Sequence, residues 1–388
     1  MYVKRDIEEY FDKVSSIYDI IAIVGARQAG KTTLLRKKLG ENNGKYISLD
    51  DPDARELFNE DIKKFEKQYV DGEGITGIDE VQYGSDAGMK LKYLADKGNK
   101  LWVTSSSEII LGKDVLSYLV GRVSIIKLFP FSLKEFQRAS GIKSLTKKIK
   151  ERIVWEHINY GGYPKVILTD DSEMKKVILR DLIETMILKD VSRTFSIDDI
   201  DSLEKLVRYL AINTGALVSY EGITSSLGIS FQTLRKYLKA MEKSYIITVV
   251  SPFYTNKSKE LIKKPKIYFV DTGLRNAIVK RSFKEFQGTI FENYVLTELM
   301  KSGFSLKYWR TKGKTEVDFI IEMDDSIVPI EVKTSANKIG KNLKSFIKTY
   351  KPERAFIVSY KGKGGQMEFE GCKISFVDIF ELLGELSS

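Results

Sequence analysis

The chain has 388 residues, of which 63 are Lys or Arg, 53 are Asp or Glu, one is His and one is Cys. At roughly 150 residues per domain, this length predicts two to four domains. The single Cys372 and the single His157 exclude disulfide frameworks, Cys-based zinc fingers, iron–sulfur sites and multi-His metal sites. The charged start of the chain and its short apolar runs predict a soluble, cytoplasmic protein without a membrane partner.

Short apolar runs alternate with longer amphipathic segments in the first third of the chain. The runs are rich in Ile and Val and nearly continuous in apolar character, as buried parallel strands are. Because the segments between them are long enough for helices, this part is expected to be an α/β layer with a parallel sheet. The expected strands are Tyr18–Val24, Lys45–Leu49, Gly74–Ile78, Lys100–Thr104 and Val123–Leu128.

A complete G-x-x-x-x-G-K-[ST] motif, a P-loop, follows the first expected strand. A helix-forming run comes next, and Gly40 is expected to end it. The glycines permit tight turns that direct backbone N–H groups at a phosphate, and the helix N-terminus adds positive charge. Lys31 is expected to reach the β- and γ-phosphates of ATP or ADP, and the Thr32 hydroxyl to ligate Mg²⁺. The nucleotide-binding residues are therefore Gly25, Ala26, Arg27, Gln28, Ala29, Gly30, Lys31, Thr32 and Thr33.

The strand ending in Asp79 and Glu80 has the Walker B pattern. Asp79 is expected to hold Mg²⁺ through water, and Glu80 to polarise the attacking water as general base. Ser106 or Thr104 would sense the γ-phosphate, with a plain polar strand end as the alternative. Arg122 would act as an arginine finger on the nucleotide of a neighbouring subunit in a homo-oligomer, or else form a surface salt bridge.

The positive charge is concentrated in one segment. Residues 201–290 carry 15 basic and 7 acidic side chains, a net charge of +8 out of +10 for the chain. A helix, a turn at Gly228 and a helix Phe231–Lys243 with Ser230 as its N-cap predict a helix-turn-helix. Two strands with lysines between them complete a winged helix, for which DNA is the favoured partner and protein docking the alternative. Expected DNA contacts are Arg235, Lys236, Lys239, Lys257, Lys259, Lys263 and Lys264, and Lys266 is counted in the same basic wing.

A third set of charged residues lies near the C-terminus. Asp318 is on an alternating strand, and Glu331 and Lys333 are two apart on the next strand, so they share a face. Two carboxylates can bind Mg²⁺, and a lysine can stabilise charge on a scissile phosphate. Glu292, on a preceding helix, would add a third carboxylate. The order matches the D…E-x-K pattern of metal-dependent nucleases, and a solvated Glu–Lys pair is the alternative.

Nearly end to end, the chain resembles a family of prokaryotic, archaeal-type AAA-like P-loop ATPases that carry a C-terminal domain of unassigned function. Ser105 stands where the family usually has Gly. The resemblance implies an ATPase core over residues 1–145, a helical lid over 146–200, a winged helix over 201–285 and a restriction-endonuclease-like α/β domain over 286–388. The matching segments are Val24–Thr33, Ile78–Gln82, Gly121-Arg122, Phe129–Phe136, Tyr160–Pro164, Lys266–Leu274, Phe291–Asn293 and Glu316–Phe319.

Three functions remain open at this point. The first is an ATPase that acts on DNA through the winged helix and the nuclease-like domain. The second is a nucleotide-controlled switch or scaffold with little nuclease activity. The third is an active Mg²⁺-dependent nuclease in the C-terminal domain.

Overall fold

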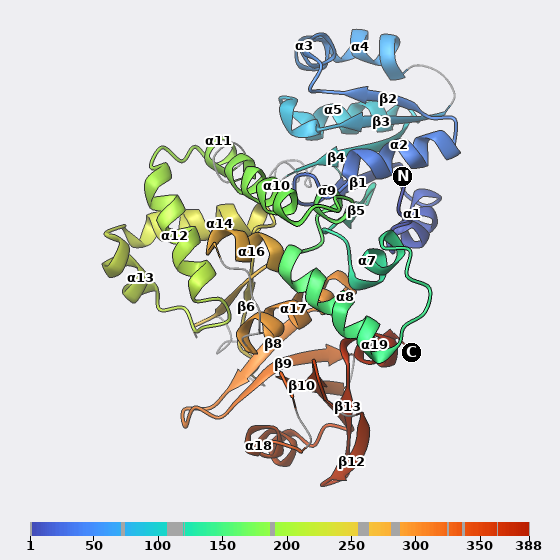
Figure 1. Cartoon of the computed structure of the whole chain (residues 1–388). Coiled ribbons are helices and arrows are strands. Elements are labelled where there is room, and N and C mark those ends of the chain that lie inside the picture. Colours follow the sequence, from blue (N-terminus) through green and yellow to red (C-terminus); the bar gives the residue numbers. More distant parts are fainter. Residues whose placement is uncertain are drawn as a thin grey trace. The chain divides into compact units, whose positions relative to one another are not determined.

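The computed structural model describes residues 2–70, 74–106, 119, 121–186, 191–254, 264–280, 288–323, 326–335, 338–362 and 364–387 (Figure 1). The chain forms two compact units. Unit 1 contains Met1–Ala139, Tyr163–Leu168 and Lys243–Ile246, and unit 2 contains Ser140–Gly162, Thr169–Glu242 and Ile247–Ser388.

Unit 1 is built around a five-stranded sheet in which every neighbouring pair of strands is parallel. The strand order is β2-β3-β4-β1-β5, so the first strand lies inside the sheet, as in a doubly wound α/β fold. The strands are β1 (Ile20–Val24), β2 (Lys45–Ser48), β3 (Ile75–Asp79), β4 (Lys100–Ser105) and β5 (Val123–Lys127). The helices are α1 (Glu8–Ser15), α2 (Lys31–Glu41), α3 (Pro52–Glu60), α4 (Ile62–Phe65), α5 (Ala87–Asp96), α7 (Leu133–Ala139) and α9 (Pro164–Ile167).

The core of unit 1 joins α1 and α2 to the sheet. Phe11 of α1 packs edge-on against Trp102 of β4, with 4.8 Å between the ring centroids. Leu34 and Leu35 of α2 lie in the same buried cluster as Ile21 and Ile23 of β1. Burial of these side chains fixes the start of α2 directly after β1, and this position decides where the P-loop lies.

Unit 2 begins with helices and ends in a mixed sheet. Its helices are α8 (Lys147–Tyr160), α10 (Ser172–Glu184), α11 (Ser192–Thr194), α12 (Ile200–Ile212), α13 (Tyr220–Leu227), α14 (Phe231–Lys243), α16 (Thr272–Ile278), α17 (Gly288–Lys301), α18 (Lys341–Tyr350) and α19 (Ile379–Ser387). A two-stranded antiparallel ribbon contains β6 (Ile247–Val250) and β7 (Lys266–Phe269).

The six-stranded sheet of unit 2 has the order β12-β13-β11-β10-β9-β8. The pairs β10–β11 and β11–β13 are parallel, and the remaining pairs are antiparallel. Phe346 of α18 packs edge-on against Trp309 of β8 at 5.2 Å, inside the main core of this sheet. The strands are β8 (Leu306–Arg310), β9 (Glu316–Met323), β10 (Ser326–Lys333), β11 (Arg354–Ser359), β12 (Gly365–Phe369) and β13 (Cys372–Val377).

The structure departs from the sequence-based expectations at three points. Helix α2 continues through Gly40 to Glu41, because an exposed glycine in the last turn costs only about 1 kcal/mol. The C-terminal region contains strands β8, β12 and β13 and helix α19 beyond the expected helix, strand, strand, helix, strand. Lys266 does not belong to a solvated wing, since it is 4% exposed and ion-paired.

Candidate functional site

The P-loop lies between β1 and α2, at the carboxyl end of the parallel sheet. Gln28 and Gly30 have φ angles of 58° and 100°, so the loop makes two left-handed turns before α2 begins at Lys31. A Cβ atom at Gly25 would stand 2.0 Å from the carbonyl oxygen of Leu128, which no side chain tolerates. Glycine is therefore required where β1 leaves the sheet, and the loop backbone is closely held.

The lysine of the motif is folded onto its own loop. Lys31 Nζ donates hydrogen bonds of 3.0 Å to the carbonyl oxygens of Gly25 and Ala26. The side chain is buried, and its charged group stays inside the loop where the motif directs phosphate oxygens. A phosphate can take over these contacts without a large movement of Lys31.

Arg5, from the segment before α1, contacts the backbone of the P-loop. Its guanidinium donates to the Ala29 carbonyl at 2.8 Å and to the Phe129 carbonyl at 2.6 Å. The same group forms a buried ion pair of 3.0 Å with Glu135 of α7. Sequence reasoning missed this contact because Arg5 is far from the motif along the chain.

Asp79 lies at the end of β3, and three hydroxyl groups converge on its carboxylate. Thr32 Oγ1 and Tyr46 Oη each donate to Asp79 Oδ2 at 2.8 Å, and Thr104 Oγ1 donates to Oδ1. The two expected Mg²⁺ ligands, Thr32 and Asp79, are thus brought together from α2 and β3. Hydroxyl and carboxylate oxygens are the ligands that Mg²⁺ prefers, so this donor set fits the ion.

Glu80 follows Asp79 in a left-handed conformation, with a φ of 56°. Its backbone N–H donates to Thr104 Oγ1 at 2.9 Å. Gln82 contacts the Glu80 carboxylate and also donates to Ser106 Oγ at 2.9 Å. Burial raises the pKa of Glu80, and the negative charges of Asp79 and Asp50 add to this effect, while Lys31 and Gln82 oppose it.

Thr104 and Ser106 hold different parts of this network. Thr104 contacts both acidic residues of the strand end, whereas Ser106 contacts Gln82. Sequence reasoning assigned no role to Gln82 or Tyr46, although Gln82 is in a segment that resembles the family. Their contacts arise from the positions of neighbouring strands, which the sequence does not give.

Arg122 lies at the amino ends of the strands, whereas the P-loop lies at their carboxyl ends. It precedes β5, and its carbonyl oxygen accepts a hydrogen bond of 3.0 Å from Ile20 N at the start of β1. Its side chain forms an ion pair with Asp96 at the end of α5. The salt bridge that the sequence left open as an alternative therefore accounts for Arg122 within its own chain.

The four C-terminal candidates gather at the hairpin of β9 and β10 and at the neighbouring α17. Lys333 Nζ lies 2.9 Å from Glu331 Oε1, and Asp318 Oδ2 accepts a hydrogen bond of 2.8 Å from Val332 N. The charges of Glu292 and Lys333 both act on Asp318. The set predicted from the sequence is thus assembled in one place.

An unexpected lysine enters this cluster from β7. Lys266 Nζ lies 3.2 Å from Glu292 Oε1 and 2.6 Å from Glu316 Oε1. Within the described part of the chain, no three His, Cys, Asp or Glu side chains are arranged to hold a metal ion. Glu292 contacts Lys266 and the Tyr268 hydroxyl, and its role as a third metal-binding carboxylate stays a prediction.

The Asp318 carboxyl has a pKa raised to about 7, chiefly by burial and next by the charge of Glu292. An unfolded Asp titrates near 4, so between pH 4 and 7 the folded protein holds a proton that the unfolded chain has released. Raising the pH through this window lowers the free energy of unfolding, by on the order of 1 kcal/mol per pH unit. Asp318→Asn is expected to match the parent in melting temperature at pH 4.5 and to exceed it at pH 8.

Thermal melts between pH 4.5 and 8 measure this difference, with exposed Glu368→Gln as the matched control. The control is expected to follow the parent at every pH. Parallel pH profiles for Asp318→Asn and the parent would contradict the raised pKa.

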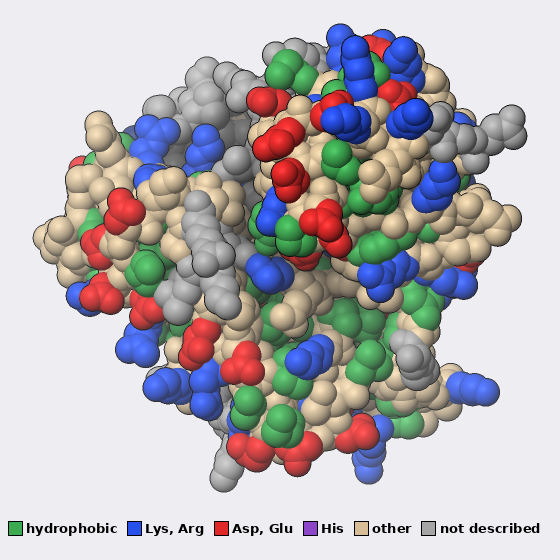
Figure 2. Space-filling model, turned by 90° about the horizontal axis from the view of Figure 1, so that it is seen from above, with side chains coloured by type: hydrophobic (Ala, Val, Ile, Leu, Met, Phe, Trp, Pro, Cys, Tyr) green, Lys and Arg blue, Asp and Glu red, His purple; other side chains and the backbone are tan. Residues whose placement is uncertain are grey.

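The expected DNA-contacting residues divide into two groups. Lys257, Lys259 and Lys263 lie outside the described residues. Arg235, Lys236 and Lys239 are exposed on one face of α14, which begins at the N-cap Ser230 as predicted. Lys236 Nζ already donates to the Ser196 carbonyl at 2.7 Å, and Lys264 Nζ lies 3.4 Å from Ser219 Oγ. On the face that Figure 2 shows, Lys and Arg side chains are interspersed with Asp and Glu.

Residues 18–137 match the family model described as an AAA domain. This part of the chain has the fold of an AAA-type P-loop ATPase. Residues 151–285 and 287–377 match two further models, each described as a domain of unknown function (DUF8612 and DUF4143). The two matches assign no activity to unit 2.

Relatives are similar over most of the chain. An uncharacterized protein of Haemophilus influenzae is 26% identical over 84% of this chain and 86% of its own length. One from Methanocaldococcus jannaschii is 28% identical over 82% of this chain and 75% of its own. Among solved structures, the Walker-type ATPase of Pyrococcus abyssi has a TM-score of 0.47 at 19% identity, covering 71% of this chain and 96% of that one. Within the described residues, no helix combines the length and apolar character needed to cross a membrane.

Proposed function

We propose that unit 1 binds ATP with Mg²⁺ at the P-loop and hydrolyses it to ADP and phosphate. The observation that carries this proposal is the convergence of Lys31, Thr32, Asp79 and Glu80 at the carboxyl ends of β1 and β3. Ligands of open parallel sheets bind at this edge. The contacts around the two carboxylates add support, because hydroxyl groups orient Asp79 and Gln82 contacts Glu80 before any ligand arrives.

Each residue has a distinct task in the proposed reaction. Lys31 exchanges the Gly25 and Ala26 carbonyls for the β- and γ-phosphates, and the loop N–H groups hold the same oxygens. Mg²⁺, held by Thr32 and Asp79, would neutralise charge on the phosphates. Glu80 orients and polarises the attacking water, and Gln82 and Ser106 keep its carboxylate in place.

Phosphate release by the purified full chain tests this proposal. Turnover is expected with Mg²⁺-ATP and is expected to stop on addition of EDTA. ATP is also expected to raise the melting temperature, because a ligand at 100 times its Kd stabilises the folded state by about 2.7 kcal/mol. The proposal is overturned if the protein shows no EDTA-sensitive turnover and no shift in melting temperature at millimolar ATP.

We further propose that the exposed face of α14 binds DNA. The net charge of +8 over residues 201–290 supports this partner, and Arg235, Lys236 and Lys239 supply charge suited to the phosphate backbone. Replacing all three by alanine is expected to weaken binding of duplex or single-stranded DNA about tenfold or more at low salt. It is also expected to reduce the salt dependence of the affinity by two to three counterions.

The matched control removes the same charge elsewhere. Lys63, Lys64 and Lys67 are exposed in unit 1, and their triple alanine variant is expected to bind DNA as the parent does. Fluorescence anisotropy at several salt concentrations measures both variants. Equal losses in the two variants would mean that net charge alone, rather than α14, determines binding.

For the C-terminal cluster, the contacts of Lys266 and Lys333 favour a nucleotide-controlled switch over DNA cleavage. Lys266 forms ion pairs with Glu292 and Glu316, and Lys333 forms one with Glu331. We propose that ATP turnover controls unit 2 as a switch and that cleavage is minor or absent. Mg²⁺- or Mn²⁺-dependent plasmid cleavage that Asp318→Asn abolishes would contradict this.

A further inference from the structure

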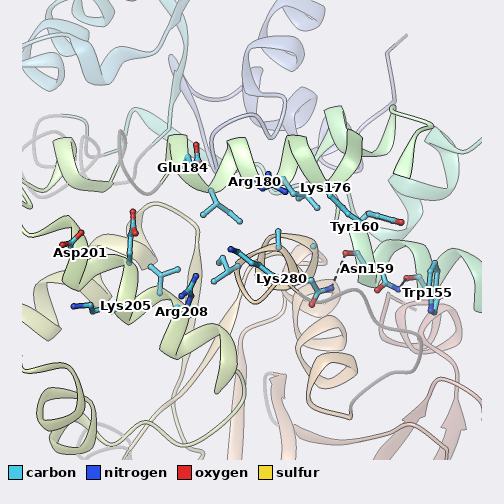
Figure 3. A pocket seen from close by; sticks show the side chains of 18 residues that line it. Trp155, Asn159, Tyr160, Lys176, Arg180, Glu184, Asp201, Lys205, Arg208 and Lys280 are labelled. Carbon is cyan, nitrogen blue, oxygen red and sulfur yellow. Dashed lines mark hydrogen bonds between the residues drawn. The ribbon is translucent and has the colours of Figure 1, made fainter. Parts of the chain in front are cut away.

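Unit 2 contains an open cavity of about 1050 Å³ that none of the sites above uses. Its walls come from α8, α10, α12 and α16 (Figure 3). Pockets for small organic ligands measure about 300–1,000 Å³. The cavity is therefore large enough for a nucleotide-sized molecule.

Five cations line the cavity: Lys176 and Arg180 of α10, Lys205 and Arg208 of α12, and Lys280 just after α16. Lys176 pairs with Glu173. Figure 3 shows Arg208 and Lys280 beside the same part of the cavity, below the helix that carries Arg180. Within the described part of the chain, the side chains of Arg180, Arg208 and Lys280 have no ion pair or hydrogen bond with another residue. Such a group of positive charges without internal partners is suited to an anion.

Carboxylates at a suitable spacing on the same helices form no ion pair with Arg180 or Arg208 in the part of the chain that the structure describes. Glu184 is four residues after Arg180 on α10, and Glu204 is four residues before Arg208 on α12. Residues at this spacing are neighbours on a helix and often pair. Neither pair forms an ion pair among the described residues, so neither carboxylate neutralises its arginine there.

The lining also contains apolar and aromatic side chains. Leu179, Val207 and Ile278 are buried residues of the lining. Trp155 and Tyr160 of α8 lie on the side away from Arg208 (Figure 3). A flat ring can pack on such a surface while a phosphate at the other side meets the cations.

We propose that this cavity binds a small phosphorylated molecule of the mononucleotide class. The guanidinium groups of Arg180 and Arg208 bind the phosphate through paired N–H donors, and Lys280 adds a point charge. The nucleoside occupies the apolar and aromatic part. A long nucleic-acid strand fits less well, because the exposed carboxylates of Glu184, Asp201 and Glu204 at the same cavity repel an extended polyanion.

Calorimetric titration of the full chain with the four ribonucleoside monophosphates tests the proposal. At least one is expected to bind, and its nucleoside without phosphate is expected to bind at least tenfold more weakly. The double variant Arg180→Ala, Arg208→Ala is expected to lose tenfold or more in affinity. Both substitutions lie on exposed helix positions where alanine favours the helix, so folding is retained.

Two controls separate this site from the P-loop and from general charge. Lys31→Ala is expected to leave binding of the monophosphate unchanged, which keeps the outcome independent of the proposed ATPase. Arg152→Ala removes an exposed arginine of α8 outside the cavity and is also expected to have no effect. The proposal is overturned if no monophosphate binds at millimolar concentration, if the double variant binds like the parent, or if only oligonucleotides bind.

Discussion

Lys31→Ala is expected to reduce ATP hydrolysis by at least about 100-fold and to remove the ATP-dependent rise in melting temperature. The lysine side chain is buried, and its Nζ lies 3.0 Å from each of two loop carbonyls. Removing a single preorganised donor to a developing charge costs about 10²–10³ in rate. Steady-state phosphate release and thermal melts with ATP measure the two effects.

The control for this variant comes from the same helix. Lys37 is exposed on α2, where it pairs with Glu41 at 3.1 Å. Lys37→Ala therefore removes an equal charge at a distance from the loop and is expected to hydrolyse ATP like the parent. If the two variants lose the same activity, the P-loop is not the site of hydrolysis.

Glu80→Gln is expected to separate nucleotide binding from hydrolysis. The amide keeps the shape of the side chain and its contact with Gln82 but cannot accept a proton, so hydrolysis is expected to fall about 10²–10⁴-fold. ATP binding is expected to stay within a few-fold of the parent, because Lys31, Thr32 and the loop backbone are untouched. Single-turnover hydrolysis and equilibrium binding of ATP provide the comparison.

Exposed Glu56 on α3 supplies the matching carboxylate-to-amide control. Glu56→Gln is expected to leave both rate and affinity unchanged. If Glu80→Gln retained more than a tenth of the parent rate, general-base catalysis would have to be assigned to another residue. A lost affinity for ATP together with the lost rate would instead indicate a structural role for Glu80.

The sheet of unit 1 was predictable because its strands carry a strong signal. All five residues of β1 are buried, as its continuous apolar run indicates. Strand β12 gives no such signal: it is an edge strand, and four of its five residues are exposed. Strand β8 is also an edge strand, and because it contains Lys307 and Arg310 its sequence lacks a continuous apolar run. Edge strands of this kind are defined by pairing rather than by burial, which the sequence does not show.

The candidate site was predictable only where a local motif defines it. Lys31, Thr32, Asp79 and Glu80 belong to segments with characteristic spacing. Arg5, Tyr46 and Gln82 reach the same site through tertiary contacts, and no characteristic motif spacing identifies them in the sequence. Lys266 was placed in the basic wing because it follows other lysines, yet its strand KIYF is buried at every position. The position of this lysine at the start of an otherwise apolar strand was the sequence signal that could have indicated its burial.

The contacts of Lys266 also limit which fragment of the chain is expected to fold stably by itself. A fragment beginning at residue 286 would keep Glu292, Glu316 and Asp318 but lose the ammonium group 3.2 Å from the first and 2.6 Å from the second. Glu316 keeps its ion pair with Arg310, but Glu292 loses Lys266, and breaking a buried ion pair in this way costs about 3–5 kcal/mol. That is a large share of the stability of a small domain. The C-terminal sheet therefore depends on β7 for its charge balance, and the two segments are expected to be inherited and exchanged together.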